Sequence, residues 1–286
     1  MFKKIHLLIA SFALAMSASP TLAAQLSNPA PAELSNIISS LDKAASKQDV
    51  EAVMKFYAPN FSHSDGFTRE IYKQSLKELW KRYKNISYRT EISKWEKQGD
   101  VITAETTTVI RGDKAEDGFD LDSRMVSMQT YKSINGNLQI LSQKILSEQS
   151  SLSSGEAPPP VMLKMPELIG VGRQYVLDAI VTEPLGTSLL LGAAIEEPVD
   201  VKTFLNENTI NLRPLRAGGI FKIGQAPFKT GDRRISVVLV RESGITITSQ
   251  RLRVSRDFTG NQYTPLPEPD TTPSRVRPRN DNQETL

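Results

Sequence analysis

A histidine and an aspartate two residues apart, His63 and Asp65, are the side chains best suited to acid–base chemistry in this chain. An imidazole exchanges a proton near neutral pH, and a neighbouring carboxylate can orient the ring. The flanking Ser62, Ser64 and Gly66 are turn-forming residues. The segment is therefore open to three interpretations: a catalytic pair, a ligand contact or a plain polar loop.

Further candidate ligand contacts are aromatic or charged. Four aromatic residues combine an apolar ring with a polar group at its end: Tyr57, Tyr72, Trp80 and Tyr88. They could bind a flat ligand, or they could pack in an ordinary hydrophobic core. Glu105 and Arg124 fall in expected strands, where alternation leaves open whether they face a cavity or solvent. If buried, either charge would need a partner and would mark a site.

The composition argues against metal and cofactor chemistry. The chain has no cysteine, and His63 is the one histidine beyond His6. No zinc or iron ligand set is apparent, and the acidic stretch from residue 113 to 122 lacks the ordered spacing of a calcium loop. No phosphate-binding glycine loop or nucleophile elbow occurs. We therefore expect no metal and no cofactor.

Helical periodicity precedes strand periodicity along the chain. Apolar residues recur at helical spacing over 34–41, 50–57 and 71–83, with Thr68 as the expected N-cap of the third helix. From residue 86 to 146 the apolar residues alternate, and Asn135-Gly136 is a hairpin signal. These patterns predict three helices followed by about four antiparallel strands in an α+β domain over 33–149.

The remainder predicts a linker, a β-domain and a tail. Residues 150–160 are rich in Ser and then Pro, which is typical of a linker. Residues 161–256 carry about seven short strand patterns separated by turn residues. Residues 257–286 hold too few apolar residues to offset chain entropy, so we expect a disordered tail.

The N-terminus predicts export. Lys3 and Lys4 precede an apolar run over residues 7–16 and a small-residue segment that ends at Ala23-Ala24. This order is typical of a signal peptide over residues 1–24, and the run is too short to span a bilayer. Large domains without cysteine favour a bacterial periplasm or extracellular space, with a soluble protein after cleavage.

The stretch Ser46–Phe61, with its Tyr-Ala-Pro-Asn segment, together with His-Ser-Asp-Gly and the helix end at Leu76–Trp80, resembles the NTF2-like (SnoaL-like) superfamily over about 33–148. The resemblance implies a cone in which three helices pack on a curved antiparallel sheet around a cavity. Members include isomerases, dehydratases and cyclases, as well as binding and dimerisation modules. The resemblance therefore predicts a fold without choosing a function.

The segment from Gly219 through Ala226-Pro227 and Gly231-Asp232 to the Val-rich strand 235–240 resembles an Ig-like β-sandwich in class. The predicted architecture is a cone followed by a separate all-β sandwich. Its expected partners are a small apolar ligand, a second copy bound through the cone's sheet, or an envelope protein. The formal charge of +3, of which Lys3 and Lys4 supply two, shows no basic face for nucleic acid. No later segment is apolar enough to span a membrane.

Three functions remain open at this point. The first is an exported, non-enzymatic protein of the periplasm that binds a small ligand or another protein. The second is an NTF2-like enzyme of the isomerase, dehydratase or cyclase kind, with Asp65 or His63 as general base. The third is a pure assembly module, whose cone pairs through the outer face of its sheet and whose tail tethers it to other components. The near absence of catalytic residue types favours the first. A cavity reached by both residues would support binding or catalysis, whereas one filled by Tyr72 and Trp80 would favour assembly.

Overall fold

A computed structural model describes residues 29–116, 118–184, 186, 189–201, 210–215 and 218–258. The predicted signal peptide and almost all of the predicted tail lie outside these residues. Within them, strands hold 59% of the residues and helices 15%. No helix of the described part is long and apolar enough to cross a membrane.

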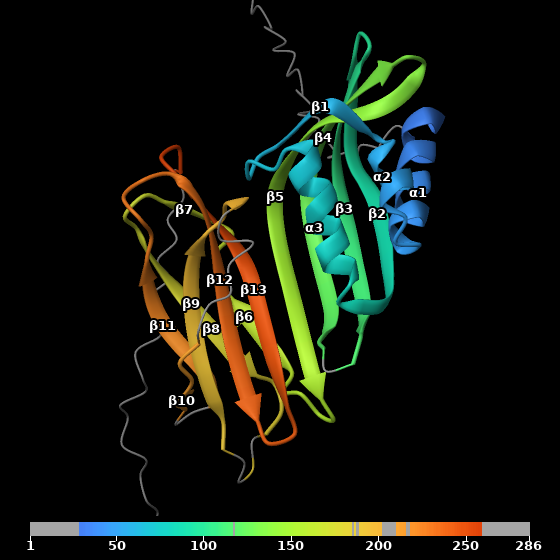
Figure 1. The fold of residues 1–286 in the computed structure, drawn as a ribbon. Coiled ribbons are helices and arrows are strands. Elements are labelled where there is room, and N and C mark those ends of the chain that lie inside the picture. Colours follow the sequence, from blue (N-terminus) through green and yellow to red (C-terminus); the bar gives the residue numbers. More distant parts are fainter. Residues whose placement is uncertain are drawn as a thin grey trace, which may run out of the picture.

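The helices lie near the N-terminus and the strands fill the rest of the described chain (Figure 1). The helices are α1 (Ala32–Ser46), α2 (Val50–Met54) and α3 (Arg69–Trp80). The first five strands are β1 (Tyr57–His63), β2 (Tyr83–Gln98), β3 (Val101–Lys114), β4 (Asp120–Ile134) and β5 (Asn137–Gly155). The later strands are β6 (Val161–Lys164), β7 (Leu168–Gly170), β8 (Gln174–Val181), β9 (Leu191–Pro198), β10 (Arg213–Pro214), β11 (Gly219–Gln225), β12 (Gly231–Arg241) and β13 (Gly244–Ser255).

One ten-stranded sheet runs through both halves of the chain in the order β10-β9-β12-β13-β5-β4-β3-β2, with β1 paired to β5 and β7 to β13. A second sheet has the order β11-β8-β6. Figure 1 shows β5 between the helix-covered half and the half that packs on the small sheet. Strands β5 and β13 join the halves, since Gln149–Gly155 pairs antiparallel with Gly244–Gln250.

The predicted fold class, an α+β cone of three helices on a sheet followed by a separate Ig-like sandwich, is therefore wrong. The protein is mostly antiparallel sheet, and the main sheet of the second half continues that of the first. The second helix ends at Met54, and the segment from Tyr57 onward forms β1. Residues 150–155 of the predicted linker extend β5, because pairing with β13 satisfies their backbone groups.

Several local predictions are confirmed. The Thr68 hydroxyl accepts a hydrogen bond from the backbone N–H of Ile71 and caps α3. Asn135 and Gly136 both have positive φ angles, 52° and 79°, as a tight hairpin between β4 and β5 requires. These features depend on neighbouring residues alone.

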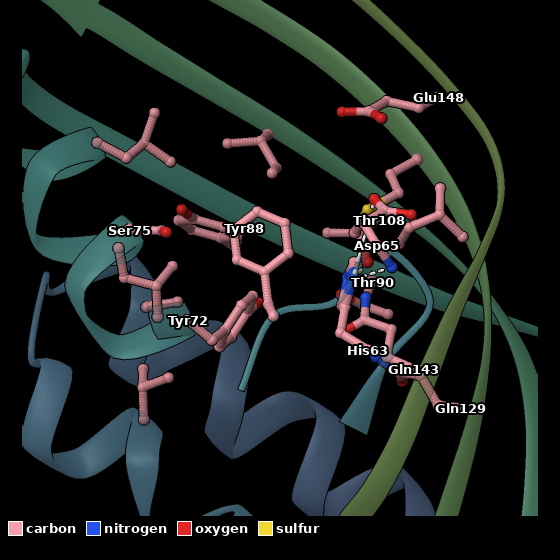
Figure 2. Close-up of a pocket in the computed structure, with 18 of the residues that line it drawn as sticks. His63, Asp65, Tyr72, Ser75, Tyr88, Thr90, Thr108, Gln129, Gln143 and Glu148 are labelled. Atoms are coloured by element: carbon pink, nitrogen blue, oxygen red, sulfur yellow. Dashed lines mark hydrogen bonds and ion pairs between the residues drawn. The ribbon is translucent and has the colours of Figure 1, made fainter. Parts of the chain in front are cut away.

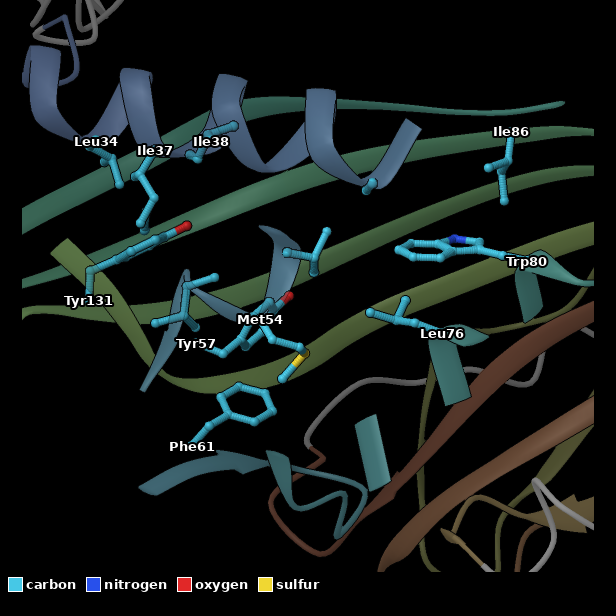
Figure 3. Close-up of a cluster of buried hydrophobic side chains, with 14 of the residues drawn as sticks. Leu34, Ile37, Ile38, Met54, Tyr57, Phe61, Leu76, Trp80, Ile86 and Tyr131 are labelled. Atoms are coloured by element: carbon cyan, nitrogen blue, oxygen red, sulfur yellow. The ribbon is translucent and has the colours of Figure 1, made fainter. Parts of the chain in front are cut away.

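The core of the first half lies between the helices and the inner face of β2–β5 (Figure 3). Leu34 and Ile38 of α1 and Trp80 of α3 are buried there, as the helical spacing predicts. Helix α1 also covers the edge strand β2. Its Asp42 carboxylate accepts hydrogen bonds from the backbone N–H and hydroxyl of Thr90 at 2.7 and 2.8 Å. The backbone N–H of Thr90, which faces away from β3 at this edge, thereby gains an acceptor.

The core of the second half lies between the two sheets. It is formed by buried residues of β8, β12 and β13, among them Leu177, Val237 and Leu252. Strand β13 is buried on both faces over Gln250, Arg251 and Leu252. One face contributes to this second core, and the other meets the turn that holds His63 and Asp65.

Candidate functional site

His63 and Asp65 lie in the turn that connects β1 to α3. Strand β1 runs parallel to β5, and His63 is the register partner of Gln143. The backbone N–H of Gly66 donates to the His63 carbonyl at 3.0 Å, and Gly66 has a φ of 84° that favours glycine. This turn brings the predicted pair to the edge of the helix-covered core.

A cavity of about 220 Å³ lies beneath the turn, between the helices and the inner face of the sheet. Both halves of the chain line it, since Val199, Asp200, Arg234 and Arg251 contribute along with the first half. The polar residues that Figure 2 labels around it are His63, Asp65, Tyr72, Ser75, Tyr88, Thr90, Thr108, Gln129, Gln143 and Glu148. The cavity is mixed in character, with aromatic walls and polar groups at discrete positions.

Three of the four predicted aromatic contacts line this cavity: Tyr57, Tyr72 and Tyr88. The fourth, Trp80, does not line it. Its indole N–H donates to the Tyr88 hydroxyl at 3.0 Å, so Trp80 positions Tyr88 without lining the cavity itself. The hydroxyl of Tyr57 donates to that of Tyr72 at 3.2 Å, and burial raises the pKa of both phenols, which keeps them neutral.

Glu105 and Arg124 are not brought to the cavity. On β3, Glu105 lies between the buried Ala104 and Thr106 and so points to the other face of the sheet. Arg124 of β4 is the register partner of Val109 of β3, which shares the face of Glu105. Both therefore project from the face of the sheet opposite to that of Thr108 and Met125, which line the cavity. Arg124 is exposed, and Glu105 lies 3.9 Å from the ammonium group of Lys94.

The hydrogen bonds of His63 define its tautomer. The backbone N–H of Asp65 donates to Nδ1 of His63 at 3.1 Å, so Nδ1 is the acceptor and the proton of the neutral ring sits on Nε2. Burial lowers the pKa of His63, with a smaller opposing effect from the charge of Asp65. Its ring is stacked near that of Tyr72, with centroids 6.2 Å apart and an angle of 26°.

Asp65 is held by an arginine that sequence analysis did not identify. Nη1 and Nη2 of Arg251 donate to its two carboxylate oxygens at 3.0 and 2.7 Å. Burial raises the pKa of Asp65, but the hydrogen bonds and charge of Arg251 outweigh it, so the pKa lies below its usual value. Arg251 also donates to Glu148 at 2.9 Å and to Asp232 at 2.8 Å. Three carboxylates therefore surround one guanidinium whose side chain is 3% exposed.

The sequence offered little sign of this cluster. Arg251 lies within the pattern Ser249-Gln-Arg-Leu-Arg-Val-Ser255, where Arg251 and Arg253 alternate with apolar residues as on any half-exposed strand. Its burial follows from the contact of β13 with the β1–α3 turn, which is 186 positions away. Glu148 and Asp232 likewise belong to strands of different halves.

Two glutamines lie on the floor of the cavity. Gln129 of β4 and Gln143 of β5 are register partners, and both are almost fully buried, at 6% and 3% exposure. The Gln129 Oε1 accepts a hydrogen bond from the Tyr131 hydroxyl. The Gln143 Oε1 is buried and has no hydrogen-bond partner within the part of the chain that the structure describes. A buried oxygen without a hydrogen-bond donor lowers the stability of the folded protein unless a bound molecule donates to it.

The described residues contain no group of three or more His, Cys, Asp or Glu side chains arranged to hold a metal ion. The carboxylates around Arg251 are instead joined through its guanidinium.

A family model described as a domain of unknown function (DUF8623) matches residues 156–255, which is less than half of the chain. That segment contains Arg251 and Asp232, whereas His63, Asp65 and the rest of the cavity floor precede it. No curated protein matches the chain.

Several solved structures are similar to part of the chain. A putative scytalone dehydratase from Novosphingobium aromaticivorans is 11% identical with a TM-score of 0.37, over 40% of this chain and 80% of its own. The hexachlorocyclohexane dehydrochlorinase LinA-type3 from Novosphingobium barchaimii is 11% identical with a TM-score of 0.34, over 40% of this chain and 83% of its own. A protein of unknown function with a cystatin-like fold from Nostoc punctiforme is 17% identical with a TM-score of 0.30, over 40% of this chain and 86% of its own.

These neighbours include enzymes and a protein of unknown function. At such identities and TM-scores the similarity assigns no activity to this chain. The resemblance to the NTF2-like superfamily remains a prediction.

Proposed function

We propose that this protein binds a small molecule in the cavity beneath the β1–α3 turn and catalyses no reaction on it. The observation that supports this most directly is the cavity itself. About 220 Å³ remains open between side chains that elsewhere in this half form a close-packed core. An apolar cavity of about 150 Å³ accommodates benzene, so this one suits a single ring with a substituent.

The geometry of His63 and Asp65 supports binding over catalysis. A histidine base needs a free ring nitrogen facing the reactant and a carboxylate that orients the ring through Nδ1–H. Here Nδ1 of His63 is an acceptor and the remaining nitrogen carries the proton. The carboxylate of Asp65 is 3.9 Å from Nδ1 and is bound on both oxygens by Arg251. Asp65 serves as an anchor of the turn.

We further propose that the protein acts outside the cytoplasm. The support is the signal-peptide pattern over residues 1–24, a stretch beyond the described residues. A cavity protein without cysteine would there depend on packing and on its Arg251 ion pairs for stability.

Native mass spectrometry of the protein purified from its host tests the binding proposal. The expected result is a retained small molecule. Ser75→Leu should abolish retention, because Ser75 lines the cavity and the larger side chain would occupy it. The control Thr103→Leu, on the opposite face of β3, should retain the molecule.

A bare protein that also shows no thermal stabilisation by any single-ring compound would contradict the proposal. Retention that survives Ser75→Leu would place the ligand elsewhere. Turnover of a retained compound that is lost in His63→Gln would restore the enzymatic alternative.

A further inference from the structure

Three polar side chains form one row across the floor of the cavity. His63 is the register partner of Gln143 on one side, and Gln129 is its partner on the other. The row therefore runs across β1, β5 and β4, and all three side chains line the cavity (Figure 2). From this row we infer that the ligand is an uncharged, flat, single-ring molecule that carries an amide or lactam group; the inference rests on the binding function proposed above.

The first step concerns the acceptor. The Gln143 side chain lines the cavity, and its buried Oε1 has no partner among the described residues. A ligand N–H that donates to it would remove the penalty of a buried unsatisfied oxygen. An apolar ligand would leave that oxygen unsatisfied.

The second step concerns the donor. Nδ1 of His63 is already occupied by the backbone N–H of Asp65, so Nε2–H is the polar group of this ring available to a ligand. A ligand carbonyl is its natural acceptor. A donor and an acceptor on neighbouring positions of the row match the adjacent N–H and C=O of an amide or lactam.

The third step concerns shape. The rings of His63 and Tyr72 are nearly parallel at 26°, and the ring of Phe67 meets that of His63 edge-on, with centroids 5.2 Å apart. These aromatic faces, together with Tyr88, form flat walls around a space of about 220 Å³. Flat rings pack best against such walls.

The fourth step concerns charge. The carboxylates of Asp65, Glu148 and Asp232 face two guanidinium groups, those of Arg251 and Arg253, so the cluster carries more negative than positive charge. Asp65 and Glu148 both line the cavity. An anionic ligand would meet this excess in a poorly solvated site, which disfavours carboxylates and phosphates.

Isothermal titration with three ring probes of similar size tests the inference: benzamide, toluene and benzoate. Benzamide should bind at least about tenfold more tightly than toluene or benzoate, because only benzamide is neutral and supplies both hydrogen-bonding groups. Gln143→Met should reduce benzamide affinity about tenfold and leave toluene affinity unchanged. It should not destabilise the unliganded protein, because it removes an unsatisfied oxygen and keeps the volume.

Gln139→Met is the matched control. Gln139 lies on the same strand and also has a buried Oε1 without a partner among the described residues, but it does not line the cavity. This variant should leave the affinity for all three probes unchanged.

Equal binding of benzamide and toluene, or benzamide affinity unaffected by Gln143→Met, would overturn the amide inference while leaving the binding function intact. A water molecule as the only occupant of the cavity, with no probe bound and no retained molecule in the native mass spectrum, would refute both.

Discussion

Arg251 and Asp65 form a two-point ion pair across 186 positions of sequence, with N–O distances of 3.0 and 2.7 Å. Asp65 lies in the turn that carries His63, and Arg251 lies on a central strand of the second half. The pair therefore joins the cavity's edge to the other half of the chain, and it places the second half among the walls of a site formed mainly by the first.

The first prediction concerns Arg251. Arg251→Met removes the cation that three buried or half-buried carboxylates share, of which Asp232 retains Arg253 at 3.7 Å. It should lower the free energy of unfolding by about 3–5 kcal/mol, the usual cost of breaking a buried pair. Urea denaturation measures it. Arg111→Met removes the exposed pair with Asp122 and should cost at most about 1 kcal/mol. Similar losses in both variants would show that the buried cluster adds no stability.

The second prediction concerns acid stability. Burial raises the pKa of Asp65, but the hydrogen bonds and charge of Arg251 lower it by a larger amount, so the pKa in the folded protein lies below 3.8. A depressed carboxylate pKa stabilises the fold above the unfolded pKa, and this stabilisation is lost as the pH falls through the folded pKa. The free energy of unfolding should therefore decrease below about pH 4. Asp65→Asn should be less stable at pH 6 and should show a shallower decrease; an unchanged acid profile would contradict this.

The third prediction concerns the state of His63. Its pKa should lie below 6.5 because burial disfavours the imidazolium ion, and its neutral form should carry the proton on Nε2. Nitrogen-detected NMR titration of the protein labelled at histidine measures both, with His63→Gln to assign the signal. A proton on Nδ1, or a pKa above 6.5, would instead indicate a pair suited to base catalysis.

The fourth prediction concerns the covered edge of the sheet. Asp42→Ala leaves the backbone N–H of Thr90 without its acceptor and should destabilise the protein by about 1–3 kcal/mol. Asp42→Asn keeps one acceptor oxygen for the hydrogen bond. Burial raises the pKa of Asp42, which shows that the charged form is disfavoured there, so the neutral Asn should cost less stability than Ala. Thermal denaturation at neutral pH compares the two. Equal losses would show that the charge, and not the hydrogen bond, matters at this edge.

The fifth prediction concerns cooperativity. Both tryptophans, Trp80 and Trp95, lie in the first half, whereas far-ultraviolet circular dichroism reports on both halves. Because β5 and β13 share one ladder and Arg251 ties the halves together, the two signals should follow one unfolding transition. Two separated transitions would show that the halves fold as independent domains.

Features that depend on near neighbours were predictable from the amino-acid sequence. Helical spacing indicated α1 and α3, Thr68 indicated a cap, and Asn135-Gly136 indicated a hairpin, because each is set by backbone chemistry within a few residues. The same local chemistry singled out the segment of His63 and Asp65 and three tyrosines that line the cavity.

The relation between the halves and the role of Asp65 follow from long-range contacts. A serine-rich stretch is typical of a linker in isolation, yet residues 150–155 are strand because β13 supplies their hydrogen bonds. Arg251 has the pattern of a surface residue on its own strand, yet its contact with the β1–α3 turn makes it the counter-ion that fixes Asp65. Both outcomes depend on partners roughly ninety or more positions away, and alternation or turn propensity along the chain carries no information about such partners.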